Sequence, residues 1–228
     1  MRELVVDTET TGLDPLAGHR LVELACVELM NHIPTGRSFQ TYLNPERDMP
    51  PEAFAIHGLS AEFLAGKPLF PAAAAGFLEF IADDPLVIHN AEFDLKFINA
   101  ELGSAGQAAL PYTRVVDTLA LARRKFPGAP ASLDALCKRY SIDNAHREKH
   151  GALLDAELLA QVYIELIGGR QAGLELAATV VASGSGSAGS AAAARRGARP
   201  ARPHAPSAEE LAAHAAFVAA LADPIWRK

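Results

Sequence analysis

The stretch LVVDTETTG (Leu4–Gly12) decides how this sequence is interpreted. Three apolar residues that favour β-structure run directly into two acids spaced two residues apart, Asp7 and Glu9. Side chains alternate along a strand, so both carboxylates lie on one face. Two like charges at that separation repel each other unless a cation lies between them. We therefore expect a buried strand over residues 3–8 that ends at a metal site, the alternative being ordinary surface acids at a strand end.

The pattern of apolar residues beyond this stretch predicts a mixed α/β domain. Two more strands are expected over Arg20–Met30 and Arg37–Leu43, with a turn over Asn31–Gly36, and three successive strands favour an antiparallel meander. Helical spacing and a short apolar run then alternate, which favours a mixed sheet covered by helices. The expected segments are helices over Ala72–Ala82, Ala91–Leu102 (with Asn90 as N-cap), Asp117–Lys125, Ser132–Tyr140 and Ala152–Ile167, and a strand over Leu86–Ile88.

Composition limits the classes of protein that the chain can belong to. Half of its 228 residues are hydrophobic, which is enough for a sizeable core. The N-terminus has no apolar signal segment, and Cys26 and Cys137 lie far apart in apolar surroundings. We expect a cytoplasmic protein with two buried, reduced thiols. The net charge of −6 repels nucleic acid, so a polyanionic substrate would require bound cations.

The C-terminal quarter of the sequence has a different composition. We expect a folded domain over 1–180, a flexible linker rich in Gly, Ser, Ala, Arg and Pro over 181–206, and a tail over 207–228. Apolar residues at helical spacing predict a short helix over Ala208–Ala222, followed by Trp226. An apolar stripe beyond a tether is typical of a docking segment for another protein, although a frayed tail has a similar composition.

Two further acids fall on the apolar stripes of expected helices. Asp94 lies one turn before Phe97 and Ile98, and Asp155 shares its stripe with the core residues of the last helix. Either acid alone could be a first-turn residue favoured by the helix dipole. A second buried carboxylate without a partner is costly, however, which favours a shared metal site. Four carboxylates offer an all-oxygen site for Mg²⁺ or Mn²⁺, and two such ions about 4 Å apart support phosphoryl displacement.

A base for the attacking water is the remaining requirement of that chemistry. His150 lies five residues before Asp155, where the chain enters the last helix, and a histidine with a pKa near neutrality can accept a proton from water. Most other histidines, His19 among them, are interpreted as surface or capping residues.

Three segments together resemble a known family. VDTETTG at Val6–Gly12, HNAEFD at His89–Asp94 and HGALLD at His150–Asp155 resemble the exonuclease motifs of the DEDD superfamily. The histidine five residues before the last aspartate marks its h subclass. Within that subclass the sequence is similar to the family of epsilon, or proofreading, subunits of bacterial DNA polymerase III. The resemblance covers residues 4–170 and, more weakly, the last twenty residues.

This resemblance implies a ribonuclease H-like fold and a 3′→5′ exonuclease that removes mismatched nucleotides from the 3′ end of DNA as nucleoside monophosphates. It assigns two Mg²⁺ or Mn²⁺ ions to Asp7, Glu9, Asp94 and Asp155, and the role of general base to His150. The residues that it implies in binding the terminal nucleotide are Thr10, Gly12, Leu13, His57, His89, Asn90 and Phe93.

The resemblance also implies protein partners. It assigns residues 207–228 to the polymerase III alpha (catalytic) subunit. The segment Gln171–Leu176 looks like a short sliding-clamp motif, although an ordinary exit from the last helix explains it nearly as well.

An RNA-trimming exonuclease and a non-catalytic interaction module are the two alternatives to a proofreading exonuclease. A stand-alone RNA-trimming exonuclease of the same superfamily needs no tether or docking helix, and the sequence has both. A non-catalytic interaction module requires a broken site, whereas all five catalytic positions are intact.

Overall fold

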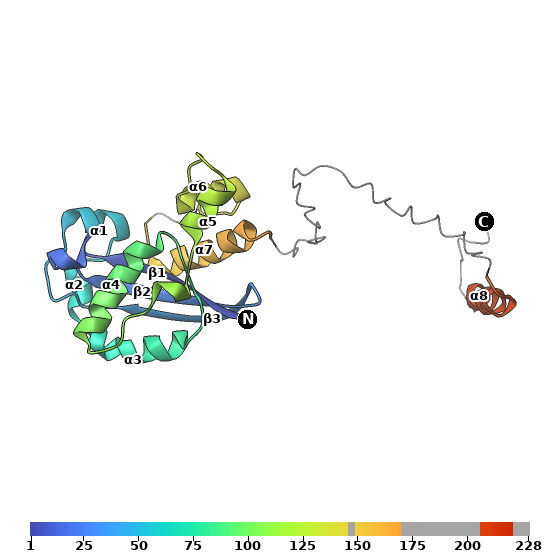
Figure 1. Cartoon of the computed structure of the whole chain (residues 1–228), viewed down its shortest axis with the longest axis horizontal. Helices are drawn as coiled ribbons and strands as arrows, with labels where there is room; N and C mark the ends of the chain where they lie inside the picture. The colour runs from blue at the N-terminus through green and yellow to red at the C-terminus, as the bar shows by residue number, and fades with distance from the viewer. Residues whose placement is uncertain (146–148, 170–205, 221–228) are drawn as a thin grey trace, which may run out of the picture. The chain divides into compact units, whose positions relative to one another are not determined.

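The computed structural model describes residues 1–145, 149–169 and 206–220 (Figure 1). The chain divides into two units, Met1–Leu176 and Ala177–Lys228, which we describe separately. Three predicted segments lie outside the described residues: the expected linker up to residue 205, the clamp-like segment Gln171–Leu176 and the end of the tail with Trp226. Within the described part of the chain, no helix is both long and apolar enough to cross a membrane.

A five-stranded mixed sheet forms the centre of the first unit, with the strand order β3-β2-β1-β4-β5. The first three strands pair antiparallel, which confirms the expected meander, whereas β4 pairs parallel with β1 and β5 pairs parallel with β4. The strand bounds are β1 Arg2–Thr10, β2 Leu21–Met30, β3 Ile33–Tyr42, β4 Leu86–Ile88 and β5 Val115–Asp117.

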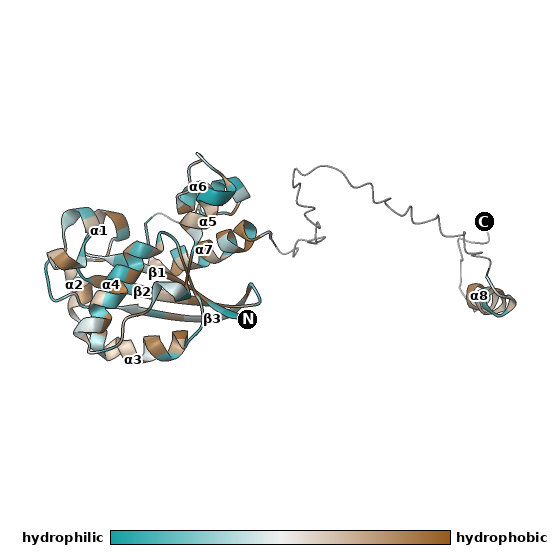
Figure 2. Ribbon diagram, in the orientation of Figure 1, coloured by the Kyte–Doolittle hydropathy of each residue, from teal (hydrophilic) through white to brown (hydrophobic). Residues whose placement is uncertain are grey.

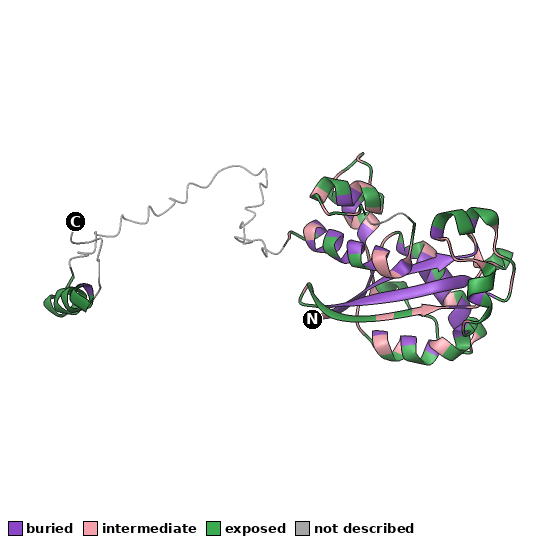
Figure 3. Cartoon of the chain, turned by 180° about the vertical axis from the view of Figure 1, so that it is seen from behind, coloured by how far each residue is buried: buried purple, intermediate pink, exposed green. Residues whose placement is uncertain are grey.

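Helices cover both faces of the sheet. Leu4 and Val6 of β1 pack with residues of α3 (Phe70–Ile81) and α4 (Ala91–Ser104) in one core cluster, and Val5 packs with residues of α7 (Ala152–Leu166) in another. Strand alternation therefore sends Asp7 and Glu9 to the face that carries α7. In Figure 3 the central strands β1 and β2 are buried, whereas much of the edge strand β3 is exposed.

Two more helices, α5 (Thr118–Lys125) and α6 (Leu133–Tyr140), pack against α7 through a third cluster of apolar residues. Figure 2 shows α7 largely in the brown of hydrophobic residues, as expected of a helix packed on two sides. The free cysteines Cys26 and Cys137 are both buried in these cores, as expected.

The unequal length of neighbouring strands leaves an open edge in the sheet. β4 pairs with β1 only at Leu4 and Val5, whereas β1 continues to Thr10. The segment Asp7–Thr10 therefore has β2 as its neighbour on one side and extends past the end of β4 on the other. Side chains from the segments after β4 and from α7 can reach β1 at this point, and the candidate active site lies there.

The structure differs from the expected elements in several places. β1 extends two residues further than expected at its C-terminal end, so that Glu9 lies within the strand together with Asp7. The expected six-residue turn is a two-residue hairpin at Asn31 and His32, which both have positive φ, and β3 starts at Ile33. Five short elements were not predicted because they are too short to show a period: α1 Pro51–His57, α2 Ala61–Ala65, β5, and the 3-10 helices Pro15–Ala17 and Tyr112–Arg114.

The described part of the second unit is the helix α8 (Ala208–Ala220), within the helix expected over Ala208–Ala222. A reciprocal capping box starts it: the Glu210 amide donates to the Ser207 hydroxyl at 3.2 Å, and the Ser207 amide donates to the Glu210 carboxylate at 2.8 Å. Leu211 and Phe217 are exposed on this helix.

Candidate active site

A cavity of about 910 Å³ opens beside the free end of β1. Every residue that was predicted from the sequence to act in catalysis, metal binding or substrate binding lines this cavity. They are Asp7, Glu9, Thr10, Gly12, Leu13, His57, His89, Asn90, Phe93, Asp94, His150 and Asp155. Seven acids line the cavity, and Arg123 is the only lysine or arginine among its described lining residues. The cavity is therefore strongly acidic and suited to cations.

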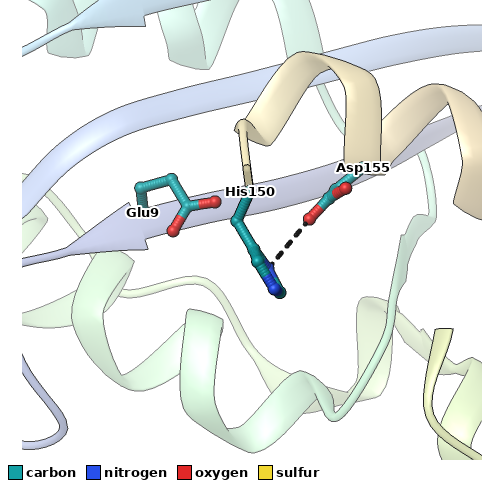
Figure 4. Close-up of side chains that lie close together, drawn as sticks. All are labelled: Glu9, His150 and Asp155. Carbon is teal, nitrogen blue, oxygen red and sulfur yellow. Dashed lines mark ion pairs between the residues drawn. The ribbon is translucent and has the colours of Figure 1, made fainter. Parts of the chain in front are cut away.

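Glu9, His150 and Asp155 form a compact group on the α7 side of the cavity (Figure 4). One ligand atom from each lies within 4.8 Å of the others. The His150 Nδ1 atom is 3.3 Å from Asp155 Oδ2. His150 is about half exposed (47%) whereas Asp155 is nearly buried (4%), so the imidazole extends from a buried carboxylate towards solvent. Such a donor set can hold a divalent ion and can also transfer a proton.

Asp94 enters the cavity from the opposite side, on the first turn of α4. Its Oδ1 accepts a hydrogen bond from the Thr8 hydroxyl at 2.6 Å, a buried contact from the other face of β1. Burial raises the pKa of Asp94 to about 7, which the hydrogen bond from Thr8 partly opposes and the nearby charge of Asp117 reinforces. A carboxylate with that pKa binds a cation readily, because the cation removes the cost of its charge.

His57 and His89 line the cavity from two different elements. His57 ends α1 and accepts a hydrogen bond from the Leu59 amide at Nδ1, so a neutral ring carries its proton on Nε2. This Nε2 atom is buried, and burial lowers the pKa of the ring, which a hydrogen bond to the backbone of Thr10 partly opposes. His89 follows β4, contacts the Thr118 hydroxyl at 2.9 Å, and also has a pKa lowered by burial. Both rings are suited to contacts with a ligand as neutral groups.

Asn90 precedes α4 but does not cap it with its side chain, contrary to our expectation. Its backbone is left-handed, with φ of 61°, and its amide donates to Asp117 Oδ1 at 3.2 Å. A residue that caps a helix with its side chain typically has an extended backbone, whereas the backbone of Asn90 is left-handed. The Asn90 side chain is thus left to line the cavity.

The structure explains the glycine at position 12 differently from the sequence. The sequence suggested a backbone of free φ, but Gly12 does not adopt positive φ. A Cβ atom at this position would lie 2.3 Å from the ring of His19. Glycine is therefore required here for the close approach of His19, whose Nδ1 contacts the Thr11 hydroxyl at 3.2 Å.

Sequence reasoning missed several residues that shape the site. His19 lines the cavity, although it was interpreted as a surface histidine. Thr8 holds Asp94, Glu23 holds the start of α7, and Arg123 places a positive charge in an acidic cavity. Only Thr8 carried a signal, since it lies between the two acids of β1. The others are contributed by segments far from the motifs in sequence.

The residues present fit a divalent-metal site. Glu9 and Asp155 converge with His150 on a volume small enough for one ion, and Asp94 is a buried carboxyl in need of a counter-charge. Asp7 lines the same cavity, two residues from Glu9 on the same face of β1. Carboxylate oxygens are the ligands that hard divalent cations prefer.

Comparison with known proteins identifies the class of this fold and site. Residues 4–163 match the family model of the exonuclease family (RNase_T). The nuclease domain of 3′hExo, a DEDDh family member solved with rAMP, aligns with a TM-score of 0.64 over 73% of this chain and 91% of its own, at 17% identity. That alignment confirms the ribonuclease H-like fold. Exonuclease X, solved with duplex DNA carrying a 5′ overhang, aligns with a TM-score of 0.57 at 25% identity, covering 72% of this chain and 90% of its own. The chain thus has the fold of the exonuclease family and belongs to it, a class of 3′→5′ exonucleases that depends on divalent metal ions.

Relatives narrow the class to one branch. The DNA polymerase III subunit epsilon of Rickettsia felis is 55% identical over 179 residues, which are 77% of this chain and 78% of the relative. The subunit epsilon of Escherichia coli K12 is 47% identical over 177 residues, 74% of this chain and 72% of the relative. The chain belongs to the family of DNA polymerase III epsilon subunits.

Proposed function

We propose that this chain is a proofreading 3′→5′ exonuclease that hydrolyses mismatched terminal nucleotides from DNA with two Mg²⁺ or Mn²⁺ ions. One observation carries the proposal: every expected site residue lines a single acidic cavity, with the ligand atoms of Glu9, His150 and Asp155 within 4.8 Å of one another. In this assignment Asp7, Glu9, Asp94 and Asp155 hold the ions, and the oxygen-rich donor set favours magnesium or manganese over softer metals.

The side chains divide the work of hydrolysis between them. Divalent ions held by Asp7, Glu9, Asp94 and Asp155 would offset the negative charge of the scissile phosphate and would lower the pKa of the attacking water. His150 faces Asp155 through Nδ1, and its other ring nitrogen, Nε2, accepts the proton of the water. Asp155 keeps the ring oriented and stabilises the positive charge that it gains. The water oxygen forms a bond to phosphorus as the bond between phosphorus and the 3′ oxygen of the preceding nucleotide breaks. That oxygen takes up a proton and becomes the new 3′-hydroxyl of the strand, and a nucleoside 5′-monophosphate leaves.

The rim of the cavity is suited to holding the last nucleotide of a strand. Leu13 is 82% exposed beside the acidic site, and Phe93 lies partly buried at the start of α4. Apolar groups in these positions can stack on a base, while the polar groups of Thr10, Asn90 and His57 contact sugar and phosphate. A frayed or mismatched end reaches such a site at lower cost, because its terminal base is already unpaired.

The experiment that tests this function is digestion of labelled oligonucleotides by the full chain. Paired and mispaired 3′ ends are compared on DNA and on RNA, with Mg²⁺, with Mn²⁺ and with EDTA. We expect monophosphate release that requires metal and is faster from mispaired DNA. Faster digestion of RNA than of DNA would instead support a stand-alone RNA-trimming enzyme, and no release with either metal would overturn the proposal.

We further propose that residues 207–228 bind the alpha subunit of the polymerase. The support is the helix α8, which begins with its own capping box and leaves Leu211 and Phe217 exposed. In this assignment residues 1–180 are the nuclease domain and residues 181–206 connect it to the tail. The complex of this chain with the alpha subunit acts in the cytoplasm.

Removal of residues 207–228 tests this assignment. We expect capture of the alpha subunit by the full chain and loss of capture by the truncated chain, with exonuclease activity on free DNA retained.

Substitution of Gln171 and Leu176 with alanine tests the clamp-like segment separately, through binding to the sliding clamp.

A further inference from the structure

Glu23 on β2 is a buried carboxylate to which the proposed metal chemistry assigns no role. It is 2% exposed, and its Cα lies opposite that of Glu9 in the pairing of β1 and β2. Residues directly opposite each other in an antiparallel pair have side chains on the same face, and like charges in such a pair destabilise the sheet. A buried acid beside a catalytic acid is therefore costly unless other groups stabilise it.

The two oxygens of Glu23 each accept a hydrogen bond. Oε1 accepts from the side-chain amide of Gln40 on β3 at 2.7 Å, and Oε2 accepts from the backbone amide of Ala152 at 3.1 Å. Ala152 is the first residue of α7, and the residue before it, Gly151, has no side chain with which to cap the helix. The carboxylate of Glu23 thus takes the place of a capping side chain, at the helix end where negative charge is favourable.

The origin of this cap distinguishes α7 from its neighbours. Asp117 caps α5 and Ser132 caps α6, each from the residue just before its own helix. The cap of α7 comes from a strand 129 residues earlier in the chain. It therefore joins the first turn of α7 to the sheet at the point where β2 pairs with the catalytic end of β1.

The joined turn carries two of the proposed catalytic groups. His150 lies two residues before Ala152 and Asp155 three residues after it, and the Asp155 amide closes the first turn by donating to the Gly151 carbonyl at 2.9 Å. On its other side, the His150 amide donates to the Ile56 carbonyl of α1 at 3.2 Å. A shift of this turn would separate His150 and Asp155 from Glu9, and such groups require placement to within a fraction of an ångström.

We propose that Glu23 is a positioning residue, which caps α7 from β2 and so sets the distance between Glu9 and the pair of His150 and Asp155. The inference rests on the proposed nuclease function for its kinetic consequences. The capping contact itself can be tested without activity.

The test uses full-length Glu23→Ala and Glu23→Gln variants with Glu28→Gln as a matched control. Glu28 is also on β2 and 2% exposed, but it binds Arg2, and its residue pairs with Leu4, away from the catalytic end of β1. We expect Glu23→Ala to lower kcat by about 10- to 100-fold with KM changed less than about threefold. Glu23→Gln keeps an oxygen for the Ala152 amide and is expected to recover part of the loss. Glu28→Gln is expected to lower the melting temperature but leave kcat within about twofold of the unchanged chain.

Hydrogen exchange of the metal-free proteins provides the readout independent of catalysis. Amides of the segment 152–155 are expected to exchange at least about tenfold faster in Glu23→Ala, to an intermediate extent in Glu23→Gln, and at the original rate in Glu28→Gln. Unchanged exchange and kcat in a folded Glu23→Ala protein would overturn the inference. Should that variant fail to fold, unchanged exchange and kcat in Glu23→Gln would overturn it. An unsubstituted chain without nuclease activity would instead contradict the proposed function.

Discussion

The starts of α4 and α7 bring two equally buried aspartates to one cavity in different ways. Asp94 and Asp155 are 4% and 3% exposed. Asp94 accepts a hydrogen bond from Thr8, and burial raises its pKa to about 7, whereas Asp155 faces the half-exposed ring of His150. Burial is the same in both, so the partner of each carboxylate decides its role. The α4 side offers a carboxyl in need of a cation, and the α7 side offers a carboxylate coupled to a base.

The largest expected effect tests what the two sides have in common. Asp94→Ala and Asp155→Ala should each lower metal-dependent monophosphate release by about 10³-fold or more, because both acids are proposed to hold the ions. Single-turnover digestion of a mispaired DNA end measures the loss, and Asp83→Ala, at an exposed turn after α3, is the control. Near-normal activity in either cavity variant would remove that aspartate from the metal site.

The second effect belongs to the α7 side alone. His150→Ala should lower kcat by about 10²-fold or more while KM stays within about threefold, because the base acts on the reacting water and not on binding of the strand. The pH–rate profile should lose the limb that reports deprotonation of the base. His32→Ala is the control, since His32 is exposed to a similar extent and pairs with Glu3 outside the cavity. An unchanged profile in His150→Ala would contradict the role of a base.

The third effect belongs to the α4 side and appears without metal. Below about pH 4, Asp94 is largely neutral in both the folded and the unfolded chain, so its burial does not lower the free energy of unfolding. As pH rises towards 7, the unfolded chain releases this proton first, so the folded state loses stability, and the loss is complete above pH 7. Asp94→Asn should therefore stabilise the EDTA-treated protein by about 2–4 kcal/mol at pH 8 and much less at pH 4.

Urea titration of the EDTA-treated proteins at pH 8 and pH 4 measures the effect of Asp94→Asn, and Asp155→Asn provides the comparison in the same titrations. It removes the partner of His150, and we expect it to lose up to about 1 kcal/mol instead of gaining stability. Equal gains from both substitutions would mean that the two carboxylates do not differ as described.

The smallest effect concerns Arg123, the only arginine or lysine among the described residues that line the cavity. Arg123, on α5, should contact a phosphate of the bound strand, so Arg123→Ala should raise KM by about three- to tenfold and reduce the salt dependence of KM, with little change in kcat. The adjacent Arg124 is exposed on the same helix but does not line the cavity. Arg124→Ala is therefore the matched control, and equal effects of the two substitutions would indicate general attraction and not a specific contact.

The sequence was informative where a local pattern has one physical explanation. Acids two residues apart after an apolar run, and acids on apolar helical stripes, predicted the positions of Asp7, Glu9, Asp94 and Asp155 in one cavity. The sheet meander and the long helices followed from periodicity. The prediction that the side chain of Asn90 caps α4 was wrong. Its backbone is left-handed and its backbone amide donates to Asp117, which lies 27 residues further along the chain.

The sequence by itself determined the set of chemically active groups. A carboxylate on a buried face destabilises the fold unless it has a partner or a metal ion, so its position in the sequence indicates a site. What only the tertiary structure decided is how those groups are held. β1 continues past the end of β4, which leaves an open edge in the sheet. The Thr8 hydroxyl donates a hydrogen bond to Asp94 on α4, and the Glu23 carboxylate accepts one at the start of α7, 129 residues further along the chain. Each of these contacts joins segments that are distant in sequence, so no local pattern of residues could reveal it.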